Sequence, residues 1–535
     1  MTAATEHSVS NPFPQTLSGG LRNPLADGVG EKLLDYARVT DRSLTNVLAS
    51  PLTGEDASAM VVGSDEDVVR AFDSARKAQR AWARTSPKER RTILHRFHDL
   101  LLTHQAEVMD IIQLETGKSR GSAFEELMHT AITARYYGNQ AGKLLKTRKA
   151  HGALPVLSQT SVYHHPKGVV GAISPWNYPL TLAMCDATAA IAAGNAVVLK
   201  PDSNTPYSAL VAIELFYRAG LPRDLFQVVP GRGSVVGQAI IARADYLMFT
   251  GSSETGKALA TQAGARLIDF SAELGGKNAM IVAEDANVNA AVEGTRIAAF
   301  TNTGHLCVSI ERLYVADKVW DEFVPKLTDR VKNMTLGSSY DWDIEMGPLQ
   351  SQAQFDIAVK FVEEAREAGA TVLAGGRARP DLGPLVYEPT ILTDVPSSSP
   401  VCHEEVFGPV VVLQRVSDVH EGIRLANDSD YGLNASLWTS PKRAKELAPQ
   451  IESGSVNVND GFAATFASVD APMGGFKQSG VGRRQGPGGL LKYTEPQTVT
   501  VQRVTPISVP FLPRKVYGLV MTIALSLGKK FRILP

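Results

Sequence analysis

One of the three cysteines in the chain lies where a thiol could react with a bound molecule. Cys307 follows Asn302 and Gly304, residue types that break regular structure and let the backbone approach a ligand closely. Neighbouring N–H dipoles at such a turn favour the thiolate form. Cys185, in an apolar helical run, and Cys402, beside charged residues, have ordinary contexts. Because free cysteines are usually packing residues, the context of Cys307 alone favours packing, and the case for reactivity depends on the rest of the chain.

A second candidate for chemistry is a glutamate among small and apolar residues. Glu273 lies in the stretch 270–278, and burial raises a carboxyl pKa toward values useful for a general base. The structural alternative is an ion pair with Lys277. The residues alone do not decide between the two.

The elements that must position these residues are those of a doubly wound sheet. Four short strand patterns alternate with helical segments, as parallel crossovers require, and they cover residues 168–173, 196–200, 226–229 and 246–249. A second α/β unit begins at 279–282, and it contains Cys307. Ligands of such sheets bind outside the carboxyl ends of the strands, so we expect a ligand where these strands end.

Two stretches resemble the phosphate loop of an NTPase without completing it. Residues 251–257 form a glycine-rich turn that opens a helix and can hold a phosphate group, but Ala258 replaces the hydroxyl that would bind magnesium. This favours a dinucleotide pyrophosphate over phosphoryl transfer, with a plain connecting turn as the structural alternative. In the stretch 115–119 the required upstream glycine is absent, because position 112 is isoleucine, and we dismiss it.

Length and composition bound the class of protein. A chain of 535 residues is too long to fold around one compact hydrophobic core, so we expect two or three domains. The formal net charge of −1 gives no reason to expect nucleic acid as a partner. Three cysteines without paired spacing argue against a disulfide framework and a zinc site, so we expect no metal and a cytoplasmic location. Residues 1–14 lack the features of a signal peptide.

Near the C-terminal end, residues 516–527 form an apolar run with basic residues on both sides. The run is too short to span a bilayer, which needs about 20 residues. It could lie in a membrane interface with its basic flanks on anionic headgroups. We favour the alternative, that it packs on the protein's own surface or on a neighbouring subunit.

Six motifs in order resemble the NAD(P)-dependent aldehyde dehydrogenase superfamily over about residues 45–500. They are Pro175-Trp176-Asn177, Phe249-Thr250-Gly251-Ser252, Glu273-Leu274-Gly275-Gly276-Lys277-Asn278, Gly304-x-x-Cys307, Glu405-x-Phe407-Gly408-Pro409 and Gly474-Gly475-Phe476-Lys477-x-Ser479-Gly480. The stretches 174–180, 270–273 and 309–312 are most similar to an actinobacterial group of succinate-semialdehyde dehydrogenases.

The resemblance implies an α/β fold with a Rossmann-type cofactor domain, an α/β catalytic domain and a small β arm for oligomerisation. The expected boundaries are 1–45 for an N-terminal extension, 46–150 and 167–276 for the cofactor-binding domain, 277–485 for the catalytic domain, 151–166 and 486–505 for the arm, and 506–535 for a C-terminal tail. Strands at 156–164 and 494–501 would build the arm and join subunits into a homodimer or homotetramer.

The family's chemistry, carried over by position, gives each residue a role. Cys307 would add to the aldehyde carbon, while the Asn177 amide and the Cys307 N–H stabilise the oxyanion. After hydride transfer to the nicotinamide, Glu273 would activate the water that hydrolyses the thioester. Lys200 would contact the adenine ribose, and we count it with the catalytic set. The expected cofactor-binding residues are Ile173, Ser174, Pro175, Trp176, Lys200, Ser203, Gly231, Gly251, Ser252, Glu273, Leu274, Gly275, Glu405 and Phe407.

Two positions depart from the family pattern. Ser203 replaces the glutamate that NAD-preferring members use to bind the ribose hydroxyls; a serine can donate to a 2′-phosphate, so we expect NADP, with NAD also admitted. His305 replaces a glutamine two residues before the nucleophile. It could tune the thiolate or substitute for a polar contact, and we favour the polar contact.

The resemblance predicts succinate semialdehyde as the substrate. An aliphatic or aromatic aldehyde is the alternative, because the 181–184 segment is apolar, and Arg312 is the candidate partner for a substrate carboxylate. Acyl transfer to coenzyme A is disfavoured by Glu273. A catalytically silent binding protein is disfavoured by the retained Cys307, Glu273 and Asn177.

Overall fold

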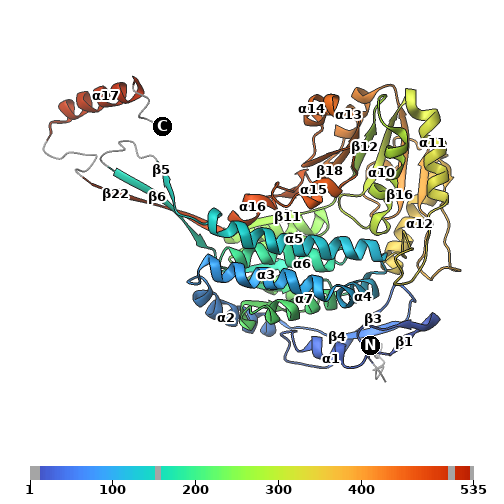
Figure 1. The fold of residues 1–535 in the computed structure, drawn as a ribbon, viewed down its shortest axis with the longest axis horizontal. Coiled ribbons are helices and arrows are strands. Elements are labelled where there is room, and N and C mark those ends of the chain that lie inside the picture. Colours follow the sequence, from blue (N-terminus) through green and yellow to red (C-terminus); the bar gives the residue numbers. More distant parts are fainter. Residues whose placement is uncertain (1–11, 151–157, 504–511, 531–535) are drawn as a thin grey trace.

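The computed structural model describes residues 12–150, 158–503 and 512–530. Two α/β units lie against each other, and a β arm extends from them (Figure 1). The first unit contains a six-stranded sheet in the order β21-β11-β10-β7-β8-β9. The bounds are Gly480–Val481 for β21, Asp269–Glu273 for β11, Tyr246–Thr250 for β10, Val169–Ile173 for β7, Ala196–Lys200 for β8 and Phe226–Val228 for β9.

The four predicted strands of this sheet are confirmed and run parallel to one another. The strand β11 was not predicted, because its residues mix charged, small and aromatic types. It extends the parallel sheet beside β10 and ends at Glu273. Its other edge pairs with β21 in the antiparallel direction, so a segment from residues 480–481 closes this sheet beside Glu273.

The second unit contains a seven-stranded sheet in the order β14-β15-β16-β13-β12-β18-β19. Its strands are Thr371–Ala374 for β14, Thr390–Thr393 for β15, Val410–Val416 for β16, Ile310–Ala316 for β13, Asn278–Val282 for β12, Asn434–Trp438 for β18 and Ser455–Val458 for β19. The strand β12 leads into α10 (Val288–Phe300), and the chain returns through Cys307 to β13.

Helix starts follow the sequence signals. The helix α2 (Asp65–Trp82) begins at a capping box in which Ser64 and Asp67 bond each other's backbone N–H groups. The same reciprocal arrangement starts α3 (Pro87–Thr103). Beside α3 lies α5 (Arg120–Leu144), which in turn packs on α6 (Pro179–Ala192). These helices form one wall of the first unit (Figure 1).

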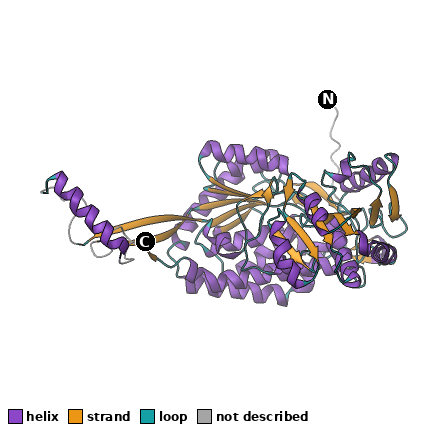
Figure 2. Cartoon of the chain, turned by 90° about the horizontal axis from the view of Figure 1, so that it is seen from above, coloured by secondary structure: helices purple, strands orange, loops and turns teal. Residues whose placement is uncertain are grey.

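The arm is a three-stranded antiparallel sheet of β5 (Arg148–Ala150), β6 (Ser158–Pro166) and β22 (Thr494–Gln502). It extends away from both units (Figure 2). The strand β22 lies at the edge of the arm, and all of its residues except Thr494 are exposed. The first two residues of the predicted strand 156–164 lie outside the described residues. So do residues 1–11 of the stretch 1–14, which we predicted not to be a signal peptide.

The apolar run near the C-terminal end is part of the helix α17 (Arg514–Lys530), beyond the tip of the arm. No residue of α17 is buried. Among the described residues the run does not pack on the protein's own surface, so this half of the expectation is wrong, and packing on a neighbouring subunit stays a prediction. Within the part of the chain that the structure describes, none of the helices combines the length and the apolar character needed to cross a membrane.

Candidate active site

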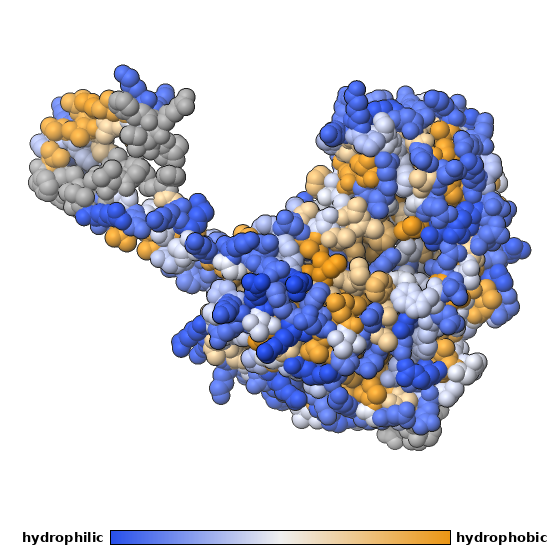
Figure 3. Space-filling view, in the orientation of Figure 1, coloured by the Kyte–Doolittle hydropathy of each residue, from blue (hydrophilic) through white to orange (hydrophobic). Residues whose placement is uncertain are grey.

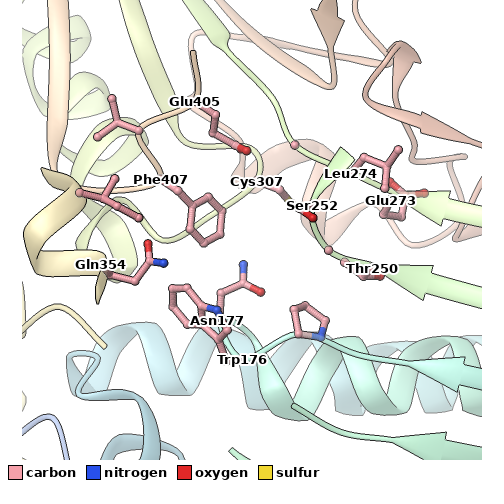
Figure 4. Close-up of a pocket in the computed structure, with 15 residues that line it drawn as sticks. Trp176, Asn177, Thr250, Ser252, Glu273, Leu274, Cys307, Gln354, Glu405 and Phe407 are labelled. Carbon is pink, nitrogen blue, oxygen red and sulfur yellow. The ribbon is translucent and has the colours of Figure 1, made fainter. Parts of the chain in front are cut away.

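A cavity of about 270 Å³ between the two units brings most of the predicted site residues together. Figure 4 shows Asn177 and Trp176 on one side of it, and Phe407 and Glu405 on the other. The predicted residues that line it are Pro175, Trp176, Asn177, Gly251, Ser252, Glu273, Leu274, Gly275, Cys307, Glu405 and Phe407. The prediction did not include four further lining residues, namely Thr250, Gln354, Ile357 and Val406.

A strained turn places Cys307 in this cavity. Asn302, Thr303 and Gly304 have φ angles of 51°, 57° and 73°, and non-glycine residues in this left-handed region cost roughly 1–2 kcal/mol each. The Asn302 side chain stabilises the turn by donating to the carbonyls of Asn177 at 3.1 Å and His305 at 2.9 Å. A Cβ atom at Gly304 would lie 2.2 Å from the carbonyl oxygen of Gly408, so only glycine fits there.

The backbone of Cys307 is held from the other side by Asn278. The Asn278 Nδ2 atom donates to the carbonyl oxygens of Cys307 and Ser309, both at 2.8 Å. Gly276 passes close by, because a Cβ atom there would lie 2.9 Å from the Cys307 carbonyl oxygen. The motif that follows Glu273 in sequence therefore positions the thiol in space.

The side-chain amide of Asn177 is oriented by one hydrogen bond. Its Nδ2 atom donates to the carbonyl of His305 at 3.1 Å, and a primary amide carries two N–H donors. The backbone carbonyl of Asn177 accepts from Lys118 Nζ at 2.7 Å. Lys118 in turn pairs with Glu126 at 2.9 Å, and both side chains are fully buried.

Lys118 is a residue whose role sequence reasoning missed. The stretch 115–119 was dismissed as an incomplete phosphate loop, and the structure gives its lysine a different task, to hold the backbone of Asn177. The only signal in the sequence was an unexplained lysine, and its partner Glu126 lies within α5.

We expect Lys118→Met to lower turnover by about 10- to 100-fold, because small displacements of a positioned group have effects of this size. It should also destabilise the fold by about 3–5 kcal/mol, since Glu126 keeps a buried charge without its partner. Turnover is measured at a temperature well below the melting temperature of the variant. Thermal unfolding measures the loss of stability separately. The double variant with Glu126→Gln should regain stability without regaining turnover, and an unchanged turnover in Lys118→Met would contradict the positioning role.

Glu273 is buried, and it does not pair with Lys277. Lys277 Nζ contacts Glu311 at 2.5 Å instead, so the structural alternative for Glu273 is wrong. Burial raises the pKa of the Glu273 carboxyl to about 7, and the nearby positive charges of Arg484 and Lys492 limit this rise. Such a pKa suits a group that must accept a proton near neutral pH.

The ion pair of Lys277 and Glu311 orients the loop that contains Glu405 and Phe407. The Glu311 carboxylate accepts from the backbone N–H groups of Val406 and Phe407 at 2.9 Å. The Glu405 carboxylate accepts from the N–H of Gly276 at 2.9 Å, and burial raises its pKa to about 8. Both predicted cofactor contacts of this loop therefore face the cavity in a fixed orientation.

The thiol of Cys307 needs a proton acceptor. Burial, with the carboxylates of Glu273 and Glu405 acting in the same direction, raises its pKa to about 12. Burial lowers the pKa of the neighbouring His305 to about 3, so that imidazole is neutral and supplies no positive charge to a thiolate. A thiol with this pKa is protonated at neutral pH, and the carboxyls of Glu273 and Glu405 line the same cavity.

His305 is a packing residue rather than the polar contact that we favoured. Its ring lies edge-on to Trp176, with centroids 4.8 Å apart, and 5.9 Å from Phe407. Its Nε2 atom is buried, and no hydrogen-bond partner for it occurs in the described residues. The ring therefore supports the wall that Trp176 and Phe407 form.

Two of the predicted cofactor residues line a second cavity, of about 320 Å³. Ser203 and Gly231 lie there, and the Ser203 hydroxyl donates to the Gly231 carbonyl at 3.1 Å. The exposed residue Arg232 lines the same cavity. Sequence reasoning missed Arg232, although it directly follows Gly231.

The remaining predicted cofactor residues, Ile173, Ser174 and Lys200, line neither of these two cavities but lie at the ends of β7 and β8. The Ser174 hydroxyl is buried, and the described residues offer it no hydrogen-bond partner. The Lys200 ammonium is buried with the Pro201 carbonyl at 2.9 Å, and burial lowers its pKa. Polar groups left in this state at the carboxyl ends of parallel strands fit a dinucleotide.

Arg312 does not serve as a carboxylate partner in the cavity. Its guanidinium donates to the backbone carbonyls of Lys277 at 2.9 Å and Ala426 at 3.0 Å. The other side of Cys307 is apolar instead. The residues of the cluster that packs against Cys307 are Tyr178, Leu182, Ile297, Leu306, Val308, Leu433, Phe462, Phe466 and Met473.

Comparisons with known proteins agree with this geometry. A sequence profile described as the aldehyde dehydrogenase family matches residues 39–499. A protein of Mycolicibacterium smegmatis, provisionally named a succinate-semialdehyde dehydrogenase using NADP+, is 52% identical over 459 residues, which are 86% of this chain and 89% of that protein. The mitochondrial succinate-semialdehyde dehydrogenase of Arabidopsis thaliana is 36% identical over 453 residues, 83% of this chain and 84% of that one.

Solved structures match as well. An NADP-dependent enzyme of E. coli has a TM-score of 0.83 at 32% identity, over 88% of this chain and 99% of its own. The NAD+ complex of an aldehyde dehydrogenase from Bacillus cereus has a TM-score of 0.82 at 32% identity, over 88% and 98%. The profile match and the identities place the chain, with its cavity around Cys307, in the aldehyde dehydrogenase family.

Proposed function

We propose that the protein oxidises succinate semialdehyde to succinate with NADP as the cofactor. One observation carries the proposal: Cys307, Glu273 and the oriented amide of Asn177 line the same cavity. The names of two relatives of this family supply the substrate, and one of those names supplies NADP. Bound NADP would supply the hydride acceptor.

In this proposal, Glu273 takes the proton of the Cys307 thiol as the sulfur adds to the aldehyde carbon. The remaining amide N–H of Asn177 and the backbone N–H of Cys307 stabilise the oxyanion, and loss of one such donor typically costs about 3–4 kcal/mol of barrier. After the hydride has left, the acyl group is held on Cys307 as a thioester. Glu273 releases the thiol proton to solvent and then removes a proton from the attacking water. As the acid forms, Cys307 leaves as a thiolate and takes that proton from Glu273, which restores the thiol.

Ser203 and Arg232 support the choice of NADP. A serine hydroxyl and an arginine guanidinium can both donate to a phosphate, and arginine does so with a pair of parallel bonds. Lys200, at the end of β8, would contact the adenine ribose. We propose that the second cavity takes the phosphate-bearing end of the cofactor.

We expect Arg232→Ala to raise the KM for NADP by about 10- to 100-fold, since a charge-assisted hydrogen bond is worth about 1.5–3 kcal/mol. The KM for NAD should hardly change. Ser203→Glu should act in the same direction by repelling the 2′-phosphate, and Ser203→Ala is the control without a new charge. Steady-state kinetics with each cofactor gives the ratio of the KM for NADP to the KM for NAD. If this ratio is unchanged in both Arg232→Ala and Ser203→Glu, the 2′-phosphate binds at another site.

A second candidate function is the oxidation of an apolar aldehyde, which one observation favours. The cluster beside Cys307 is aromatic and aliphatic, and neither lysine nor arginine lines the catalytic cavity among the described residues. A carboxylate substrate would therefore meet few positive charges there.

The absorbance of reduced cofactor separates the two candidates. Succinate semialdehyde, hexanal and benzaldehyde should be compared by kcat/KM, each with NADP and NAD. A preference for succinate semialdehyde with NADP supports the first proposal. A preference for hexanal or benzaldehyde keeps the chemistry of Cys307 and transfers the substrate assignment to the second candidate.

We further propose a cytoplasmic homodimer or homotetramer joined through the arm. The three cysteines are free, which suits a reducing compartment. The strand β22 lies at the edge of the arm and its residues 495–501 are exposed, so a strand of a second copy could pair with it. Light scattering on the purified chain measures the number of subunits.

A further inference from the structure

The helix α17 carries a continuous apolar stripe that nothing in the described chain covers. Its residues recur at spacings of three and four, which places them on one side of a helix. Between 44% and 63% of the surface of each is exposed, and they are Val516, Leu519, Val520, Ile523 and Leu527. Leu525, 44% exposed, lies on the opposite side of the helix and is not part of the stripe. Figure 3 shows hydrophobic residues gathered at this end of the molecule.

The charges of α17 all have one sign. Arg514 and Lys515 begin the helix, and Lys529 and Lys530 end it, and the helix contains no acidic residue. The chain as a whole has a formal net charge of −1, so the positive charge of this helix is local. Two copies of α17 packed on each other would bring like charges together, whereas an anionic surface would neutralise them.

The shape of α17 suits a surface rather than a groove. A helix of 17 residues is about 25 Å long at a rise of 1.5 Å per residue, and its charges lie at both ends. The helix lies beyond the arm (Figures 1 and 2), and none of its residues lines the catalytic cavity. A flat partner can therefore reach the stripe without meeting the two α/β units first.

We propose that α17 binds the surface of a membrane that contains anionic lipid. The helix lies in the plane of the membrane, with the stripe in the boundary between headgroups and acyl chains, and its two basic ends contact anionic headgroups. The arm then holds the catalytic units beside the membrane.

The test is co-sedimentation of the full chain with phosphatidylcholine vesicles, with and without about 30% phosphatidylserine. The bound fraction should be at least about tenfold higher with phosphatidylserine and should fall at high salt, because surface charges are screened. The stripe variant Leu519→Ser/Ile523→Ser and the charge variant Lys529→Ala/Lys530→Ala should each lose most of this binding. The control Thr522→Asn/Ser526→Asn changes two polar residues that border the stripe and leaves its apolar residues unchanged, so it should bind like the unmodified chain.

Light scattering on the same variants, and their aldehyde-dependent reduction of cofactor, complete the experiment. Both should be unchanged, because α17 lies apart from the catalytic cavity. Equal binding with and without phosphatidylserine, or equal binding by the stripe variant and the control, overturns the proposal. If the unmodified chain does not bind vesicles and the stripe variant forms a smaller oligomer, the stripe binds a second copy of the chain instead of a membrane. The sedimentation result does not depend on which aldehyde is the substrate.

Discussion

Replacing Cys307 by alanine is expected to lower the rate of aldehyde oxidation by at least about 10⁴-fold. The proposed reaction needs a covalent sulfur adduct, and neither of the other two thiols lines the cavity. Cys185 is buried beside Thr181, and burial raises its pKa to about 11. Cys402 lies at the loop near Pro396, outside the cavity. The alanine variant should bind cofactor normally, since the backbone of Cys307 is held by Asn278.

Two measurements check this expectation. The absorbance of reduced cofactor gives the rate, and intact-protein mass spectrometry after mixing with aldehyde and cofactor detects an acyl group on the chain. Cys402→Ala is the matched control, because it makes the same substitution in a thiol outside the cavity and should keep full activity. A Cys307→Ala variant that keeps its turnover would falsify the thioester route, whatever the substrate.

The strands that carry the site could be predicted because they are short, apolar and buried on both faces. The patterns that predict β7, β8, β9 and β10 are mostly apolar, and a glycine or proline follows each of them within two residues. The strand β11 has no such pattern, because Asp269 and Glu273 stand at its two ends. Its place in the sheet depends on pairing with β10 and β21, which are distant in sequence, so tertiary contacts rather than local preference decide it.

The residues that we propose to react could be predicted from the sequence to lie together, but the residues that hold them in place could not. Cys307, Glu273 and Asn177 stand in motifs that can be read along the chain. Lys118 and Arg484 act across the fold, and no local pattern announces a contact between residues so far apart. The exposure of α17 could not be predicted for a similar reason. The apolar composition of its run predicts burial, but the helix is exposed because it lies beyond the arm.

Arg484 illustrates how such a support acts on the chemistry. It is buried, forms an ion pair with Asp186 at 2.7 Å and donates to the Thr250 hydroxyl at 3.0 Å. Thr250 lies opposite Glu273 in the parallel register of β10 and β11. A buried positive charge beside the strand of Glu273 lowers the pKa of that carboxyl, against the larger effect of burial. The balance leaves Glu273 able to gain and lose a proton near neutral pH.

Glu273→Gln should lower turnover by about 10²- to 10⁴-fold, the range in which a positioned general base contributes. Glutamine keeps the size of the side chain but cannot take a proton. Because the folded carboxyl has its pKa raised to about 7, the carboxylate form is present above that pH. The turnover of the unmodified enzyme should therefore rise with pH through about 7, and this rise should be absent in the variant.

Because Glu405 is a second carboxyl in the cavity, the Glu273→Gln variant is needed to decide which of the two causes the pH dependence. Burial raises the pKa of Glu405 to about 8, so a rise of activity with pH could come from either residue. Glu405 is already bonded to the N–H of Gly276, whereas the proposal gives proton transfer to Glu273 alone. If Glu273→Gln keeps the rise, the base is another group. If the rise is lost and no acyl group forms on Cys307, Glu273 is also the base for thiol addition, as proposed, whereas an acyl group that accumulates limits Glu273 to hydrolysis. Glu115→Gln is the control, because that carboxyl is also buried, with its pKa raised to about 8, but it bonds Ser208 outside the cavity.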